Sequence, residues 1–96
     1  AAALGLATAA LPADEVLPAA MATARDIAAN TAPVSVAVAK RLLWASMDQT
    51  VHDTQRLESA LFPKVTALPD AREGIAAFVE KRPPSWQGRV SRDLPS

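Results

Sequence analysis

The stretch PDAREGIAAFVEKRPPSW, residues 69–86, contains the most closely spaced structural signals in the sequence. Asp70 is a favoured N-cap residue, and Glu73 stands three positions later, as in a capping box. Ile75 and Phe78 recur at the spacing of one helix face, and two prolines follow the basic pair. Because proline cannot continue a helix, these residues predict a short capped helix that ends before a proline turn and a tryptophan.

The composition limits how large a core this helix can join. The 96 residues make at most one small domain, and a chain of this length buries roughly 60 to 65% of its unfolded surface. Half of the residues are hydrophobic, but 22 are alanine and only four are aromatic. We therefore expect a thin core and additional burial against a partner surface.

Charge and cysteine content exclude several classes of function. Lysine plus arginine equals aspartate plus glutamate at ten each, which leaves no basic field for nucleic acid or an anionic membrane. Cysteine is absent, so disulfides, thiolate catalysis and cysteine metal sites are excluded. No apolar run reaches the roughly 18 residues of a membrane span, and a charged signal-peptide start is missing. We expect a soluble, cytoplasmic protein without nucleic-acid or membrane partners.

The first residues, AAALG, have the pattern of the last turn of a helix that ends at Gly5. The sequence does not start with methionine, so we expect a fragment in which residues 1–11 are the end of a preceding core domain. Residues 6–11 are expected to run extended as a short strand, which Pro12 ends.

Helical periodicity dominates residues 12–89, which we expect to form one helical domain. Asp14 is the expected N-cap of the first helix, and Pro33 is the expected first residue of the second. The apolar face of the first helix consists of Leu17, Ala20, Met21, Ala24, Ile27 and Ala28, and that of the second of Val34, Ala37, Val38, Leu42 and Ala45.

A third helix is predicted from near Thr50 to Val65. Pro63 is expected to kink or break it, because proline removes a helical hydrogen bond and clashes with the preceding turn. The helix within residues 69–86 is the fourth, and the polar tail, residues 90–96, is expected to fray. The sequence thus predicts an all-α fragment of about four short helices with one short N-terminal strand.

The residues alone do not assemble a catalytic or metal site. His52 is the only histidine, and no cysteine or tyrosine is present to complete a metal set or a nucleophilic triad. Glu58 near Arg56 is interpreted as part of a solvated helix face, and Asp70 with Glu73 as a cap. The three glycines are too scattered to form a phosphate-binding loop.

Phe62, Phe78 and Lys81 are the candidate binding residues. Phe78 and Lys81 are one helical turn apart, and Phe62 lies on the preceding predicted helix. Such a set can hold an apolar chain or a flat base while the ammonium group meets a phosphate. The alternative interpretation, two core phenylalanines and a solvated lysine, stays open on these residues alone.

One segment carries a family resemblance. DAREGIAAFVEKRPPSWQG, residues 70–88, combines Asp with a following Glu-Gly pair, then apolar residues and Phe, then Glu-Lys-Arg, proline and an aromatic residue. In this pattern the chain resembles the carboxy-terminal part of the crotonase superfamily, the enoyl-CoA hydratase/isomerase proteins, and the likeness covers residues 4–89. Supporting positions are Gly5-Leu6, Pro12, Ala32-Pro33, Lys40 and residues 58–62.

The resemblance implies a C-terminal trimerisation region of a crotonase-like fold, with association into homotrimers or hexamers. It also implies that Phe62, Phe78 and Lys81 match family positions that approach the CoA adenine and acyl groups from a neighbouring subunit. The implied substrate is an acyl-CoA thioester of fatty-acid metabolism, and no separate cofactor or metal is expected.

The family's catalytic groups do not map onto this chain. Hydration of a 2-enoyl-CoA uses two backbone N–H groups as an oxyanion hole and carboxylates that move water or a proton. Those segments lie upstream in the family, and neither Glu15 nor Glu58 matches them. We therefore expect an enoyl-CoA hydratase-like lyase as the parent protein and no activity in the 96 residues alone.

Two alternatives remain at this stage. A parent with the same fold but different chemistry would be an isomerase, a decarboxylase, a thioesterase or a non-catalytic member, and only the missing carboxylates could separate these. A protein of another class would be a stand-alone helical interaction module, for which a stable monomer without CoA affinity is expected.

Overall fold

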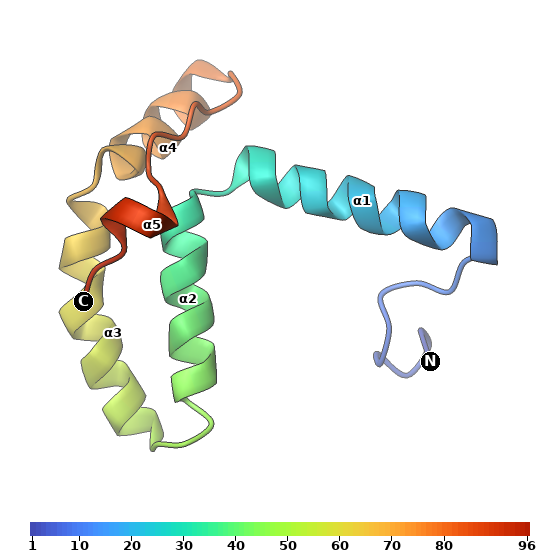
Figure 1. Ribbon diagram of the computed structural model, residues 1–96, viewed down its shortest axis with the longest axis horizontal. Helices are drawn as coiled ribbons and strands as arrows, with labels where there is room; N and C mark the ends of the chain where they lie inside the picture. Colours follow the sequence, from blue (N-terminus) through green and yellow to red (C-terminus); the bar gives the residue numbers. More distant parts are fainter.

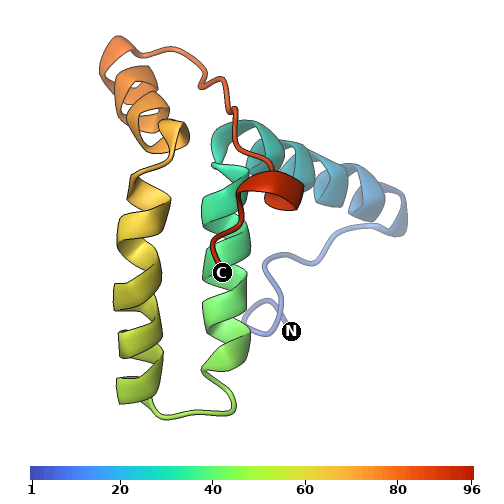
Figure 2. The same cartoon turned by 60° about the vertical axis from the view of Figure 1, so that its left-hand side comes forward.

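The computed structural model describes all 96 residues, and the chain is all-α (Figure 1). Its five helices are α1 (Ala13–Asn30), α2 (Pro33–Ala45), α3 (Val51–Thr66), α4 (Pro69–Glu80) and α5 (Val90–Asp93). α2 and α3 form an antiparallel hairpin, α4 follows at the far end of α3, and α5 packs against α2 (Figures 1 and 2). α1 extends away from this group.

The core lies between α2 and α3 and is as thin as the composition predicts. It is built around Val34, Val38 and Leu61, with neighbouring leucines and Val65 packed against them. Only five of the 96 residues are buried. Every residue of the predicted α2 face is buried or half-buried, which confirms that the three- and four-residue spacing was interpreted correctly there.

α1 shows the same periodicity, but its apolar face is not buried in this chain. None of its residues is buried, and Leu17 on its predicted apolar face is 70% exposed. The predicted N-cap is also wrong, because the helix begins at Ala13 with Pro12 in the N-cap position. Asp14 lies inside the first turn and makes no capping hydrogen bond.

The predicted strand over residues 6–11 is not formed. A strand needs a neighbour to receive its hydrogen bonds, and the 96 residues contain no other strand. The predicted turn at Gly5 is confirmed, with a φ of 77°. The Gly5 and Leu6 N–H groups donate to the carbonyls of Ala2 and Ala1 at 3.1 and 3.0 Å, which is the paired pattern of a helix C-terminus.

α3 begins at the predicted place and continues past its proline. The Thr50 hydroxyl accepts a hydrogen bond from the Asp53 N–H at 3.1 Å, so Thr50 caps the helix. Pro63 does not break α3, which runs one further turn to Thr66. Proline removes only its own N–H donor, while Leu61 and its neighbours pack against α2 and hold the helix in place.

The capping box predicted for α4 is wrong. Leu68 is the N-cap residue and Pro69 is the first helical residue, which places Asp70 inside the helix. Asp70 is buried, with only 5% of its surface exposed. Its two carboxylate oxygens accept hydrogen bonds from the backbone N–H groups of Gln87 and Gly88 at 2.7 and 2.8 Å. Asp70 therefore binds the backbone of residues 87–88 and does not cap α4.

Gly88 is required for this close approach. A Cβ atom at position 88 would lie 2.7 Å from an Asp70 oxygen and 3.1 Å from a Val34 methyl group. Only glycine lets the backbone come this near to a carboxylate and the core at the same time.

The C-terminal tail is not frayed as predicted. It forms α5, whose first turn is closed by the Asp93 carboxylate accepting from the Arg89 N–H at 2.8 Å. Further along, Arg41 donates to the Pro95 carbonyl at 3.1 Å, and Lys64 donates to Ser96 at 3.2 Å. The tail is polar, but its polar groups find partners on α2 and α3.

We predict that Asp70→Asn destabilises the fold by about 1 to 3 kcal/mol, because an amide presents one acceptor oxygen where two backbone donors are buried. Denaturant unfolding measures the loss, and hydrogen exchange should show faster exchange at the amides of Gln87 and Gly88. The matched control is Asp14→Asn, an exposed change expected to stay within about 0.5 kcal/mol of the original. Unchanged exchange at both amides would contradict the role of Asp70.

Candidate functional site

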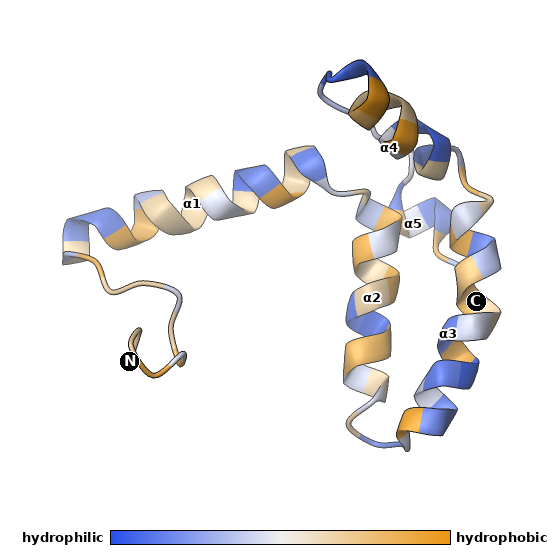
Figure 3. Cartoon of the chain, turned by 180° about the vertical axis from the view of Figure 1, so that it is seen from behind, coloured by the Kyte–Doolittle hydropathy of each residue, from blue (hydrophilic) through white to orange (hydrophobic).

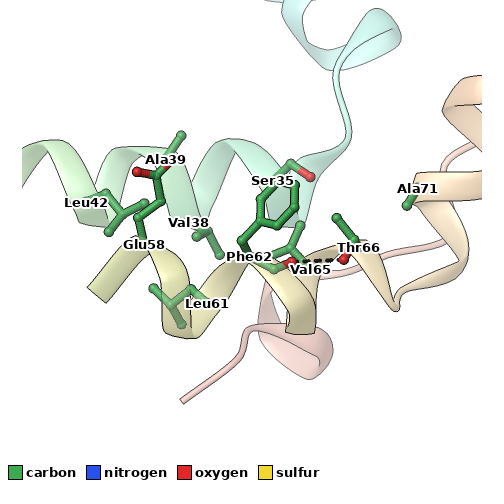
Figure 4. A pocket seen from close by; sticks show the side chains of 10 residues that line it. All are labelled: Ser35, Val38, Ala39, Leu42, Glu58, Leu61, Phe62, Val65, Thr66 and Ala71. Atoms are coloured by element: carbon green, nitrogen blue, oxygen red, sulfur yellow. Dashed lines mark hydrogen bonds between the residues drawn. The ribbon is translucent and has the colours of Figure 1, made fainter. Parts of the chain in front are cut away.

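A groove between α2 and α3 is lined in part by the candidate residue Phe62 (Figure 4). It encloses about 290 Å³, and most of its lining is apolar. Phe62 borders it from α3 and remains 64% exposed. The lining residues are Ser35, Val38, Ala39, Leu42, Glu58, Leu61, Phe62, Val65, Thr66 and Ala71.

The groove offers an apolar surface with few polar groups. The Thr66 hydroxyl is already engaged, donating within its own helix to the Phe62 carbonyl at 3.0 Å (Figure 4). The exposed side chains of Ser35 and Glu58 supply the remaining polar atoms. Such a lining suits an aliphatic chain or a flat ring, with hydrogen-bonding groups restricted to the edges.

Phe78 lies elsewhere, on α4. It is 84% exposed and borders a second hollow of about 220 Å³ that includes Gly74 and Trp86. Phe62 lines the α2–α3 groove and not this hollow, so the structure does not bring the two phenylalanines into one pocket. The open alternative, that both are core residues, is excluded within this chain by their exposure.

Lys81 stands one residue past the end of α4. Its backbone adopts the left-handed conformation, with φ 53° and ψ 46°, and it is the only non-glycine residue with positive φ. The Lys81 N–H donates to the Phe78 carbonyl at 3.3 Å, and the Arg82 N–H donates to the Ala77 carbonyl at 3.0 Å. A non-glycine residue in this conformation costs about 1 to 2 kcal/mol, so the surrounding contacts must hold it.

Those contacts come from an ionic clasp made of Glu73, Glu80, Arg82 and Ser85. The Arg82 guanidinium donates to both oxygens of Glu73, at 2.6 and 3.2 Å, and to Glu80 at 2.5 Å. The Ser85 N–H donates to Glu73 at 2.9 Å. The clasp therefore joins the body of α4 to the chain on both sides of the proline pair.

The clasp shifts the pKa values of Glu73 and Arg82. The hydrogen bonds from Arg82 and from the Ser85 backbone lower the pKa of Glu73 from 4.5 to about 2. The same hydrogen bond to Glu73, followed by the one to Glu80, raises the pKa of Arg82. Glu73 and Arg82 are thus both charged over the whole physiological range.

The remaining candidates from the sequence form no site. His52 is exposed on α3, and its neighbour Asp53 pairs with Arg56 at 3.3 Å. No three histidine, aspartate or glutamate side chains gather closely enough to hold a metal ion. No helix combines the length and the hydropathy needed to cross a membrane.

Sequence reasoning missed the clasp and the hydrogen bond that the Trp86 indole makes with α1. The Trp86 ring lies over Gly74, where an added Cβ would be 3.5 Å away, and its indole N–H donates to the Ala29 carbonyl at 3.0 Å. This contact links the end of α1 to α4. The sequence did contain a signal for the clasp: Glu73 lies within the predicted helix, and the oppositely charged Arg82 directly precedes the proline pair.

A family model described as enoyl-CoA hydratase/isomerase matches residues 1–89 of this chain. Among solved structures, a probable enoyl-CoA hydratase/isomerase from Mycobacterium abscessus is 41% identical with a TM-score of 0.85, covering 92% of this chain and 35% of that one. An enoyl-CoA hydratase/isomerase from Mycobacterium paratuberculosis is 31% identical with a TM-score of 0.78, covering 92% and 34%.

Curated relatives carry two kinds of name. A carnitinyl-CoA dehydratase from Proteus mirabilis is 37% identical, covering 72% of this chain and 29% of the relative. A probable mitochondrial enoyl-CoA hydratase from Dictyostelium discoideum is 35% identical, covering 88% and 30%. The chain therefore spans about a third of the length of the proteins that it matches.

We predict that Glu73→Gln makes the fold less sensitive to acid. The pKa of Glu73 is lower in the folded chain, so its stabilising effect is complete above about pH 4.5 and is lost as the pH falls toward about 2. Denaturant midpoints measured at neutral pH and in steps through that range should fall less steeply in the variant. Glu15→Gln, at an exposed carboxylate without an ion pair, is the control. Identical acid profiles for Glu73→Gln and the original chain would contradict the clasp.

Proposed function

The chain belongs to the enoyl-CoA hydratase/isomerase family, and from this membership we propose that it is the helical C-terminal part of an acyl-CoA enzyme. In that enzyme it joins subunits into a trimer or hexamer and helps to close the CoA site. The reaction proposed for the whole protein is addition of water to a 2-enoyl-CoA thioester. By the whole protein we mean this chain together with the region that its relatives have beyond the match.

The observation that carries the proposal is the amount of apolar surface left exposed. Ile75, Phe78 and Val79 on α4 are 69, 84 and 71% exposed, and α1 has no buried residue at all. Hydrophobic residues recur along α1 and on α4 (Figure 3). Surface of this kind is stabilised when a partner removes it from water, which supports burial against a core domain and other subunits.

The proposal assigns binding to this chain and chemistry to the rest of the protein. Water addition needs an oxyanion hole for the thioester enolate and a carboxylate that activates water. No residue of this chain is proposed for either role. The 96 residues alone are accordingly expected to be inactive.

The dispersed candidate residues fit a site shared between subunits. Phe62 and Phe78 present exposed rings in separate hollows, and Lys81 presents an ammonium that makes no ion pair. We propose that Phe62, Phe78 and Lys81 contact the CoA and acyl groups held by a neighbouring subunit. On this view the three residues need not converge within one chain.

The names of the relatives favour one chemistry over the alternatives. A hydratase adds water and a dehydratase removes it, which is the same bond change in opposite directions. We therefore propose water addition or elimination, with isomerase, decarboxylase and thioesterase chemistry as the alternatives that the assay below distinguishes. A stand-alone helical module is disfavoured because five buried residues make a very small independent core.

We predict that the whole protein hydrates crotonyl-CoA and sediments as a trimer or hexamer. The assay follows loss of the enoyl absorbance and formation of the 3-hydroxy thioester by mass spectrometry. The 96-residue chain, assayed in parallel, should leave the substrate unchanged. Release of free CoA would instead indicate a thioesterase, and a catalytically silent monomer would contradict both parts of the proposal.

We also predict that Phe78→Ala weakens binding of butyryl-CoA, a saturated thioester, to the whole protein. Loss of an aromatic stacking contact is worth about 1 kcal/mol, which corresponds to roughly fivefold in the dissociation constant. Isothermal titration calorimetry measures the change, and sedimentation checks that assembly persists. Val51→Ala, at an exposed position at the start of α3, is the control. Unchanged affinity with intact assembly would remove Phe78 from the site.

A further inference from the structure

The turn that carries Lys81 is unusual because a strained backbone presents an unpaired charge. Lys81 has the left-handed conformation that glycine normally takes at the end of a helix. Its ammonium takes part in none of the four ion pairs of the chain. A residue that only had to end α4 would be expected to be glycine, so the lysine side chain is the feature to explain.

Arg82 pairs with the two carboxylates of α4 that are nearest to Lys81 in the sequence. Glu73 and Glu80 are the acidic residues closest to this turn along α4, and the Arg82 guanidinium contacts both, at 2.6 and 2.5 Å. A lysine beside two free carboxylates would be expected to pair with one of them. With Arg82 in place, the Lys81 ammonium stays available to an anion from outside the chain.

Glu73 fixes the far side of the same turn. It binds Arg82 through both oxygens and also accepts the Ser85 N–H at 2.9 Å. One carboxylate thus joins α4 to the chain before and after the two prolines. Without it, Lys81 would be held in its left-handed conformation by the two backbone hydrogen bonds at the end of α4 and by the contact of Arg82 with Glu80.

We propose that Glu73 and Arg82 are positioning residues that hold the Lys81 ammonium ready for a phosphate group of an acyl-CoA. This inference rests on the proposed function, because it takes Lys81 as a CoA contact. It adds that the contact depends on two charged side chains that do not themselves touch the ligand. Lys81 supplies the positive charge, and the clasp orients the lysine side chain toward the phosphate group.

The test is a double-mutant cycle on the whole protein with butyryl-CoA as the probe. Lys81→Met should weaken binding about fivefold to tenfold, as for losing a charged hydrogen bond at an accessible site. Glu73→Gln should weaken binding by a similar factor, and adding it to Lys81→Met should have no further effect. Lys81→Arg, which keeps the charge, should restore most of the affinity.

Butyryl-pantetheine, which lacks the nucleotide phosphates, separates positioning from general damage to the fold. Its affinity should be the same for the original protein, Lys81→Met and Glu73→Gln. Weaker binding of this probe to Glu73→Gln would overturn the positioning role, since the loss would not involve a phosphate. Glu15→Gln, outside the clasp, should bind both probes normally.

Failure of this inference can be told apart from failure of the proposed site. If Lys81→Met weakens butyryl-CoA binding and Glu73→Gln does not, Lys81 remains a CoA contact and the positioning role is overturned. Additive effects in the double variant would overturn it as well. If Lys81→Met binds butyryl-CoA normally, Lys81 is not a contact, and both the assignment and the inference fall.

Discussion

The arrangement of the C-terminal half depends on the buried carboxylate of Asp70. It accepts two backbone N–H groups seventeen and eighteen residues later in the chain, and the missing side chain of Gly88 leaves room for that approach. This contact returns the chain to α2 after the proline pair and places α5 there. It also closes the loop in which Glu73 and Arg82 meet, so the turn at Lys81 depends on it indirectly.

The second constraint is the shortage of internal partners for apolar side chains. α2 and α3 pack against each other through Val34, Val38 and Leu61, while the apolar side chains of α1 and of the outer side of α4 remain exposed within this chain. Each helix satisfies its backbone hydrogen bonds locally, but isolated helices of this length are only marginally stable in water, and most helical stability comes from packing of an apolar face. Their mutual packing is sparse, and the contacts that fix α4 and α5 are mainly polar. Within this chain the architecture is therefore a sparsely packed set of helices that leaves large apolar side chains exposed to solvent.

The sequence predicted the features that depend on local spacing. The α2 face, the Thr50 start of α3 and the turn at Gly5 follow from patterns within a few residues. The role of Asp70 was predicted wrongly because the sequence does not distinguish an aspartate that caps its own helix from one that binds a distant backbone segment. The partners that distinguish the two roles, Gln87 and Gly88, lie far along the chain. The strand was predicted from propensity without a neighbour, which is the information that a strand needs. For the site, residue type and spacing singled out Phe62, Phe78 and Lys81 and the resemblance added support, but periodicity could not tell an exposed ring from a buried one.

The motif at residues 70–88 combines two kinds of residue that the sequence does not separate. Asp70, Glu73 and Arg82 set the shape of the segment through hydrogen bonds within it, and Gly88 allows the close contact with Asp70. Phe78 and Lys81 point outward and have no role in that shape beyond the backbone of the turn. A pattern of this kind identifies a family because many positions must agree for the turn to form. It says little about the reaction, because the groups that would move water or protons are not among them.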